Sequence, residues 1–270
     1  MRKEGAKPTQ PAKASARGSY RNRKPPESNR DVFINCPFDD AYKPIFSGIV
    51  FTIVRSGFVA RCALEEDNAG NIRFSKICTI IDESGYGIHD ISRTELDLKN
   101  KLPRFNMPLE LGLFLGAARF GSKPKQCIIF DVARFRYQKF ISDLAGQDIH
   151  EHKGDVDTVI LEVATWLRQQ SRDERVPGGK AIAAEYKAFC RKLPALCRAS
   201  KITQDELTFG DFNVIVADYL TKGGATGKVP GGGSAKIALP TPRPPRLPVG
   251  RPTKVKSKPR STPAIKTKEP

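Results

Sequence analysis

The sequence has few of the residues that build metal centres and disulfide frameworks. It contains three histidines and six cysteines, and the cysteines form no CxxC pair and have no histidine at zinc-ligand spacing. Most of the cysteines lie in apolar runs, where a free thiol acts as a small hydrophobic side chain. We therefore expect no metal site, no disulfides and a reducing compartment, the cytoplasm.

Long apolar runs and the common phosphate-binding glycine motifs are also missing. No segment reaches the roughly 18 apolar residues that a membrane-spanning helix needs, and the N-terminus is polar where a signal peptide would be apolar. We expect no membrane partner. The absence of GxGxxG and GxxxxGK[ST] argues against dinucleotide-dependent redox chemistry and against NTP hydrolysis, so no cofactor is predicted.

Basic charge is concentrated at the two ends of the chain. Residues 1–30 hold nine Lys or Arg against two Glu, and residues 222–270 hold twelve against one, whereas residues 31–221 hold 25 basic and 26 acidic residues. The ends also carry 14 of the 21 prolines. Such composition predicts disordered tails. Their Lys and Arg would contact nucleic acid weakly and without sequence preference, or simply keep the chain soluble.

Strand and helix patterns alternate after residue 30. Short β-branched and aromatic runs predict strands at 31–36, 58–65, 86–91 and 125–131, and amphipathic runs predict helices at 42–57, 71–84 and 107–121. Strands separated by helices imply parallel crossovers. We therefore predict an α/β domain over residues 31–150, a flavodoxin-like doubly wound parallel sheet.

Helical patterns dominate the rest of the chain. They cover 136–146, 155–170, 179–193 and 203–220. We predict a helical extension over residues 151–221, in which at least one helix covers the sheet and the last pair forms a small appendage.

Open parallel sheets bind ligands beyond the carboxyl ends of their strands, so polar residues at those ends are the candidates for a site. Arg61 and Arg93 are able to hold phosphates with bidentate geometry, or to be solvated. The stretch from Ser92 to Glu95 fits a helix capping box. His89 lies in a strand that should be buried, where a core histidine is the favoured interpretation.

Glu110 is the one carboxylate of the otherwise apolar helix in "RFNMPLELGLFLGAARFG". Pro108 suits the first helical position, which puts Glu110 third, where an acid interacts well with the helix dipole. Its side chain also shares a helical stripe that should face the sheet, which aims the carboxylate into the crevice. The stripe comprises Glu110, Leu113, Phe114 and Ala117, and is flanked by Gly112 and Gly116, which would allow close helix–strand approach.

Three segments resemble the superfamily that joins TIR-like domains and nucleoside 2-deoxyribosyltransferases. They are "DVFINCPFDDAYKPIF", "GIHDISRTE" and "RFNMPLELGLFLGAARFG", all within about residues 31–135. In that superfamily a Glu in an N-x-x-x-E-L-G-like segment is the catalytic carboxylate acting on an N-glycosidic bond. The resemblance implies that role for Glu110.

The resemblance also implies a nucleotide pocket around the same crevice. Asn35, Phe38 and Asp39 would line it from the first loop, and Asp90 would lie near the ribose hydroxyls. The full set of predicted nucleotide-binding residues is Asn35, Phe38, Asp39, Arg61, Asp90, Ser92, Arg93 and Asn106.

A lone carboxylate favours NAD as the substrate. An ionised carboxylate stabilises or traps the oxocarbenium-like sugar, and nicotinamide leaves as a neutral ring without needing a general acid. We expect the helix N-terminus to keep Glu110 ionised. The resemblance to deoxyribosyltransferases implies an acidic residue paired with the Glu near the start of this helix. This sequence has Asn106 at the matching position, which favours the TIR-like branch.

The resulting expectation is an NAD glycohydrolase-like enzyme. The resemblance implies the role of a bacterial defence or stress effector that forms a homo-oligomer on activation. Three alternatives stay open. They are a sensor or adaptor that binds a nucleotide signal without turnover, a deoxyribosyltransferase-like enzyme, and a nucleic-acid-associated protein whose binding depends on its basic tails.

Overall fold

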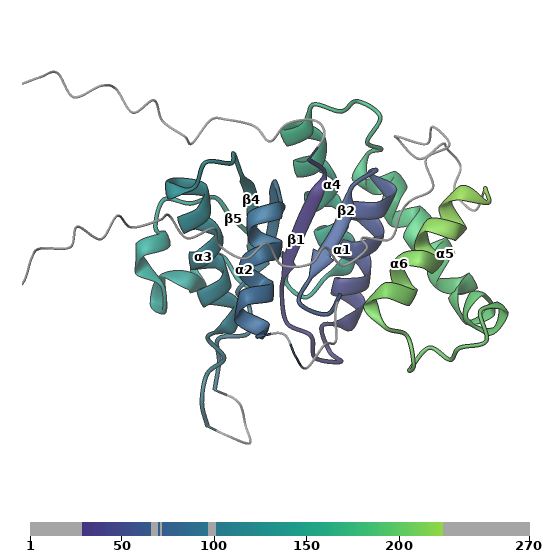
Figure 1. Ribbon diagram of the computed structural model, residues 1–270, viewed down its shortest axis with the longest axis horizontal. Coiled ribbons are helices and arrows are strands. Elements are labelled where there is room, and N and C mark those ends of the chain that lie inside the picture. Colours follow the sequence, from purple (N-terminus) through teal and green to yellow (C-terminus); the bar gives the residue numbers. More distant parts are fainter. Residues whose placement is uncertain (1–28, 66–69, 71, 97–100, 224–270) are drawn as a thin grey trace, which may run out of the picture.

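The computed structural model describes residues 29–65, 70, 72–96 and 101–223. Nearly all of the predicted disordered tails lie outside these residues. Five strands form one parallel sheet in the order β2-β1-β3-β4-β5 (Figure 1). The strands are β1 (Asp31–Asn35), β2 (Val59–Cys62), β3 (Tyr86–Asp90), β4 (Gln126–Asp131) and β5 (Ile149–Glu151). This order is the flavodoxin-like one and confirms the predicted fold class.

Helices cover both faces of the sheet (Figure 1). The α-helices that the structure describes are α1 (Lys43–Arg55), α2 (Arg73–Glu83), α3 (Asn106–Phe120), α4 (Val156–Ser171), α5 (Gly179–Ala199) and α6 (Phe209–Thr221), of which α1 to α4 flank the sheet. Because side chains alternate along a strand, Phe33 packs against α2 and α3 whereas Val32 and Ile34 belong to the core shared with α1 and α4. None of the helices in the described ranges is long and apolar enough to cross a membrane.

Helices α5 and α6 form a second layer over α1 and α4. Phe51 of α1 stacks against Tyr186 and Phe189 of α5, with ring centroids 5.4 and 5.2 Å apart. Both helices contribute to the same large core as the strands. The last two helices therefore pack on the α/β layers through a continuous apolar interior.

Glycine allows the close contact of α1 with α4. A Cβ added at Gly48 would lie 2.9 Å from Val156 Cγ1, nearer than real Cβ atoms approach. The two helices thus cover their face of the sheet as a tightly packed pair.

Two features between β4 and α4 differ from the sequence prediction. The predicted helix at 136–146 is replaced by two 3-10 turns, η2 (Arg136–Lys139) and η3 (Ser142–Leu144). The strand β5 follows them and was not predicted, because three half-buried residues at a sheet edge give no periodic pattern.

Candidate functional site

The carboxyl ends of β1 and β3 form the switch point of the sheet. These strands are neighbours, but β1 continues into α1 on one face and β3 leads to α3 on the other. The chain diverges here, and ligands of such sheets bind in the space beyond these strand ends, which is called the candidate crevice below. Asn35 ends β1 and Asp90 ends β3, so both lie at this point.

Asn35 joins the two strands to α3. Its Nδ2 donates to the Met107 carbonyl oxygen at 2.8 Å and lies 3.1 Å from His89 Nδ1. Since Nδ1 accepts from the amide, neutral His89 carries its proton on Nε2. Asn35 therefore fixes where α3 begins relative to the sheet.

His89 is a buried, neutral core residue. Burial lowers its pKa to about 3. Its ring packs edge-on against Phe114 with centroids 4.8 Å apart, and Nε2 makes no hydrogen bond within the described part of the chain. This agrees with the interpretation favoured from the sequence.

Asp90 is fully buried and contacts residues from several parts of the chain. Its Oδ2 accepts a hydrogen bond from the Tyr42 hydroxyl at 2.6 Å, and its Oδ1 accepts one from the Ser92 backbone N–H at 2.8 Å. His152 Nε2 lies 3.1 Å from Oδ2, within ion-pair distance but without hydrogen-bond alignment. Because Asp90 has no exposed surface, a ribose hydroxyl would reach it only if one of these partners moved away.

Arg136 holds the segment after β3 in place. Its Nε donates to Asp131 Oδ1 at 2.8 Å, and its Nη2 donates to the Ser92 carbonyl at 2.8 Å. Asp131 is completely buried, and burial raises its pKa even though Arg136 opposes the shift. The guanidinium thus ties the end of β4 to the loop that carries Ser92.

Sequence patterns did not identify Arg136, Asp131 or His152 as neighbours of the site. Asp131 ends the predicted strand "KQCIIFD", which is the available signal, because polar residues at strand ends are candidates. Arg136 and His152 lie in stretches without a strand pattern, so the sequence offers no signal for them.

The loops after β1 and β3 meet through Asp39 and Arg93. Arg93 Nη2 lies 3.3 Å from Asp39 Oδ1, which also accepts from the Tyr42 backbone N–H at 3.0 Å. The Arg93 side chain is 42% exposed. Phe38 is 39% exposed and leans edge-on against Phe46 of α1. The structure therefore brings Asp39 and Arg93 together at the mouth of the crevice.

The predicted capping box at Ser92 to Glu95 is wrong. No helix begins among the described residues there, and Leu96 instead pairs with Pro103 in an antiparallel bridge. The Ser92 N–H bonds to Asp90, which orders a turn rather than a helix.

Helix α3 begins earlier than expected. Its first residue is Asn106, so Pro108 is third and Glu110 fifth. Proline fits anywhere in the first turn, because those N–H groups have no intrahelical partner, so it did not define the start. The helix dipole acts most strongly in the first turn, and Glu110 consequently lies beyond that turn.

Glu110 is half-buried, and burial favours the protonated form of its carboxyl group. Burial raises its pKa from 4.5 to about 7, against an opposing effect of Arg73 at the start of α2. As predicted, its stripe continues into Phe114, which is fully buried, and into the partly buried Leu113 and Ala117. The expectation of an ionised Glu110 is therefore corrected to a group that titrates near neutrality.

The glycines of α3 do not serve close packing. A Cβ added at Gly112 or Gly116 would have nothing within 4 Å. The predicted close helix–strand approach at these residues is wrong, since both face open space.

The Cys36 thiol shows how the carboxylates converge. Cys36 is buried directly after β1, and its pKa is raised by burial and then by Asp90, Cys62, Glu110 and Asp39. Asp39, Asp90 and Glu110 therefore each lie near enough to the end of β1 to act on this thiol.

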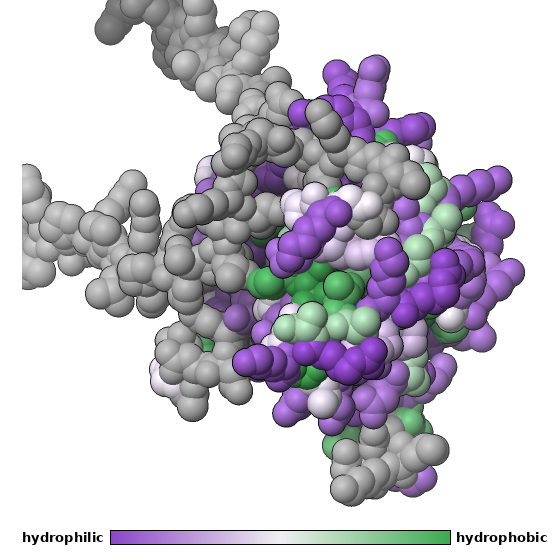
Figure 2. Space-filling view, turned by 90° about the vertical axis from the view of Figure 1, so that its right-hand side faces the viewer, coloured by the Kyte–Doolittle hydropathy of each residue, from purple (hydrophilic) through white to green (hydrophobic). Residues whose placement is uncertain are grey.

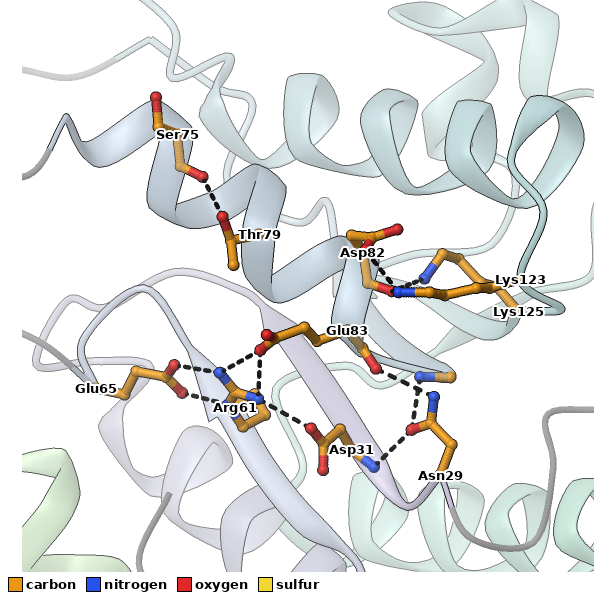
Figure 3. Close-up of polar contacts among 11 residues, drawn as sticks. Asn29, Asp31, Arg61, Glu65, Ser75, Thr79, Asp82, Glu83, Lys123 and Lys125 are labelled. Atoms are coloured by element: carbon orange, nitrogen blue, oxygen red, sulfur yellow. Dashed lines mark hydrogen bonds and ion pairs between the residues drawn. The ribbon is translucent and has the colours of Figure 1, made fainter. Parts of the chain in front are cut away.

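Arg61 is engaged elsewhere, as Figure 3 shows. Its guanidinium makes a bidentate ion pair with Glu65, at 2.8 and 2.7 Å, and it also contacts Asp31 and Glu83. Three carboxylates already surround it, so a phosphate would have to displace one. Asn106 is exposed at the first position of α3.

No protein-family model matches this sequence, and neither a curated protein nor a solved structure is detectably similar to it. Within the described residues, no group of three or more His, Cys, Asp or Glu is arranged to hold a metal ion. The class defined by the coordinates is therefore a flavodoxin-like α/β protein whose switch point lies between β1 and β3.

Proposed function

We propose that this protein cleaves the N-glycosidic bond of NAD or a related nucleotide, with Glu110 as the catalytic carboxylate. The observation that carries the proposal is the half-buried Glu110 at the switch point, with a pKa of about 7. A carboxylate with a perturbed pKa in the ligand-binding crevice of such a sheet is a functional-site candidate.

The chemistry requires one ionised carboxylate near the anomeric carbon. As the bond to nicotinamide breaks, positive charge develops on the ribose, and a carboxylate stabilises it or traps it covalently before water attacks. Nicotinamide leaves as a neutral ring. Because the ionised form acts and the pKa is about 7, cleavage should increase as the pH rises through 7 and then level off.

Neighbouring groups support binding. The Arg93 guanidinium is accessible at the mouth of the crevice and would exchange Asp39 for a pyrophosphate oxygen. Asn35 holds the first turn of α3 through the Met107 carbonyl, which fixes the position of Glu110 one turn further along. Asp90 would act here through the loops that it orders.

The activity would deplete NAD, which suits a bacterial defence or stress effector whose output depends on self-association. That context comes from the resemblance, so the test covers a range of protein concentrations.

The experiment measures nicotinamide release from NAD by the full chain, comparing wild type with Glu110→Gln. We expect Glu110→Gln to lose at least about a hundredfold, the size of a lost catalytic group. Glu174→Gln, at an exposed glutamate after α4, is the matched control and should keep full activity.

Three outcomes would redirect the proposal. Equal release by wild type and Glu110→Gln would remove Glu110 from the mechanism. Silence of both at every concentration, with NAD still raising the melting temperature, would leave a binding site and favour the sensor reading. Transfer of the sugar to an added free base would instead favour a deoxyribosyltransferase-like enzyme.

A further inference from the structure

Helix α5 presents a row of basic side chains to solvent. Lys180, Lys187, Arg191 and Arg198 are all exposed. With 100° between successive residues they point within about 20° of one direction, and they span about 27 Å. The buried Cys197 shows that α5 keeps its orientation beyond Pro194. These four residues are called the α5 basic stripe.

The charge of this stripe is largely uncompensated. The one acidic residue of α5, Glu185, turns inward and pairs with Arg55 of α1 at 2.5 Å. Lys187 pairs with Asp157 of α4. Among the residues that the structure describes, Lys180, Arg191 and Arg198 make no ion pair. The surface therefore carries a positive field that the fold itself does not neutralise.

The basic C-terminal sequence leaves the fold from the same layer. Helix α6 packs against α5 and ends at Thr221, and residues 222–270 contain twelve Lys or Arg against one Glu. Figure 2 looks onto this side of the molecule, where hydrophilic residues surround a smaller hydrophobic area. The stripe and the start of the tail thus belong to one side of the protein.

We propose that the α5 basic stripe binds the phosphate backbone of double-stranded nucleic acid. A row of cations about 27 Å long on one helix face matches a regular line of phosphates, whose condensed counterions are released on binding. The stripe has no aromatic surface for stacking unpaired bases, because Tyr186 and Phe189 are buried. The other exposed residues of α5 lack the large apolar groups of membrane-inserting helices; they are Ala181, Ala184, Cys190, Lys192, Ala195 and Ala199.

This surface is separate from the Glu110 crevice. Helix α5 lies over α1 and α4, on the opposite side of the sheet from α3. The inference therefore does not depend on the proposed NAD cleavage, and its test has a different readout.

The test measures binding of the full chain to a fluorescent DNA duplex of arbitrary sequence, about 30 base pairs long, at several salt concentrations. The stripe variant carries Lys180→Gln, Lys187→Gln, Arg191→Gln and Arg198→Gln. The control variant carries Arg119→Gln, Arg134→Gln, Lys139→Gln and Lys153→Gln, which removes the same charge from other exposed sites. Both retain the tails, so their contribution cancels in the comparison.

We expect the stripe variant to bind at least about tenfold more weakly at low salt, with the slope of log K against log salt reduced by about 3. The control variant should bind like wild type. Thermal melts monitored by circular dichroism check that both fold. If the fourfold variant melts early, the pair Lys180→Glu and Arg198→Glu, at the two ends of the stripe, replaces it with the same expectation.

Equal losses in the stripe and control variants would overturn the proposal, since the effect would then follow net charge alone. Loss of binding to phosphatidylserine vesicles with unchanged duplex affinity would also overturn it and assign the stripe to membranes.

Discussion

The Tyr42 hydroxyl donates a 2.6 Å hydrogen bond to Asp90 Oδ2, and both side chains are buried. Tyr42 lies just before α1 and Asp90 at the end of β3, so this bond joins the first loop to the middle of the sheet. The geometry of the candidate crevice depends on it, because Asp39 and Arg93 lie on the two segments that it connects.

Tyr42→Phe should destabilise the protein by about 1.5–3 kcal/mol, the usual effect of removing a hydrogen bond to a charged group. The substitution leaves the ring and its packing and removes one partner of a buried carboxylate. Urea denaturation of the full chain measures the change.

Tyr219→Phe is the matched control for that substitution. Tyr219 is buried too, but its hydroxyl has no hydrogen-bond partner in the described part of the chain. Removing it should be neutral or slightly stabilising. Equal losses at positions 42 and 219 would show that the bond to Asp90 contributes nothing of its own.

Glu110→Gln should change how stability depends on pH. Because folding raises the pKa of Glu110 from 4.5 to about 7, the native state holds a proton that the unfolded chain has released, and wild type loses stability as the pH rises through that window. Glutamine does not titrate. The melting temperature of the variant relative to wild type should therefore increase from pH 4.5 to pH 8, and a constant difference would contradict the burial of this carboxylate.

Lys125→Met should destabilise the fold by about 1–2 kcal/mol, the usual cost of unpaired buried acceptors. Lys125 Nζ donates to the carbonyls of Ile81 and Ser84 at 2.5 and 2.6 Å. It also donates to the Asp82 carbonyl at 3.2 Å, and Figure 3 shows the two residues side by side. These bonds satisfy carbonyls at the C-terminal end of α2. Burial lowers its pKa to about 8. Chemical denaturation measures the effect.

Lys123→Met provides the comparison. Lys123 pairs with the exposed Asp82 carboxylate at 2.6 Å, and both side chains are about half-exposed or more. A surface pair of this kind contributes at most about 1 kcal/mol. If Lys123→Met destabilised the protein more than Lys125→Met, then Lys123 rather than Lys125 would be the lysine that stabilises the end of α2.

Local sequence patterns were sufficient to predict the architecture but not the side-chain contacts within the candidate site. Four strands and the flavodoxin-like arrangement follow from alternating buried runs, because each run is long enough to carry its own signal. The contacts of Asp90 with Tyr42 and His152 join residues 48 and 62 positions apart, and no local pattern encodes such pairings. The Glu110 stripe was predictable, whereas its raised pKa required knowledge of the burial around it.

The layer of α5 and α6 has a consequence for synthesis. The apolar face of α1 includes Phe51, whose partners Tyr186 and Phe189 are made more than a hundred residues later. At synthesis rates of roughly 5–20 residues per second, that face stays uncovered for several seconds or longer while the rest of the chain is made. A chain interrupted before α5 would keep it open and prone to aggregation, so the smallest fragment worth preparing extends to the end of α6.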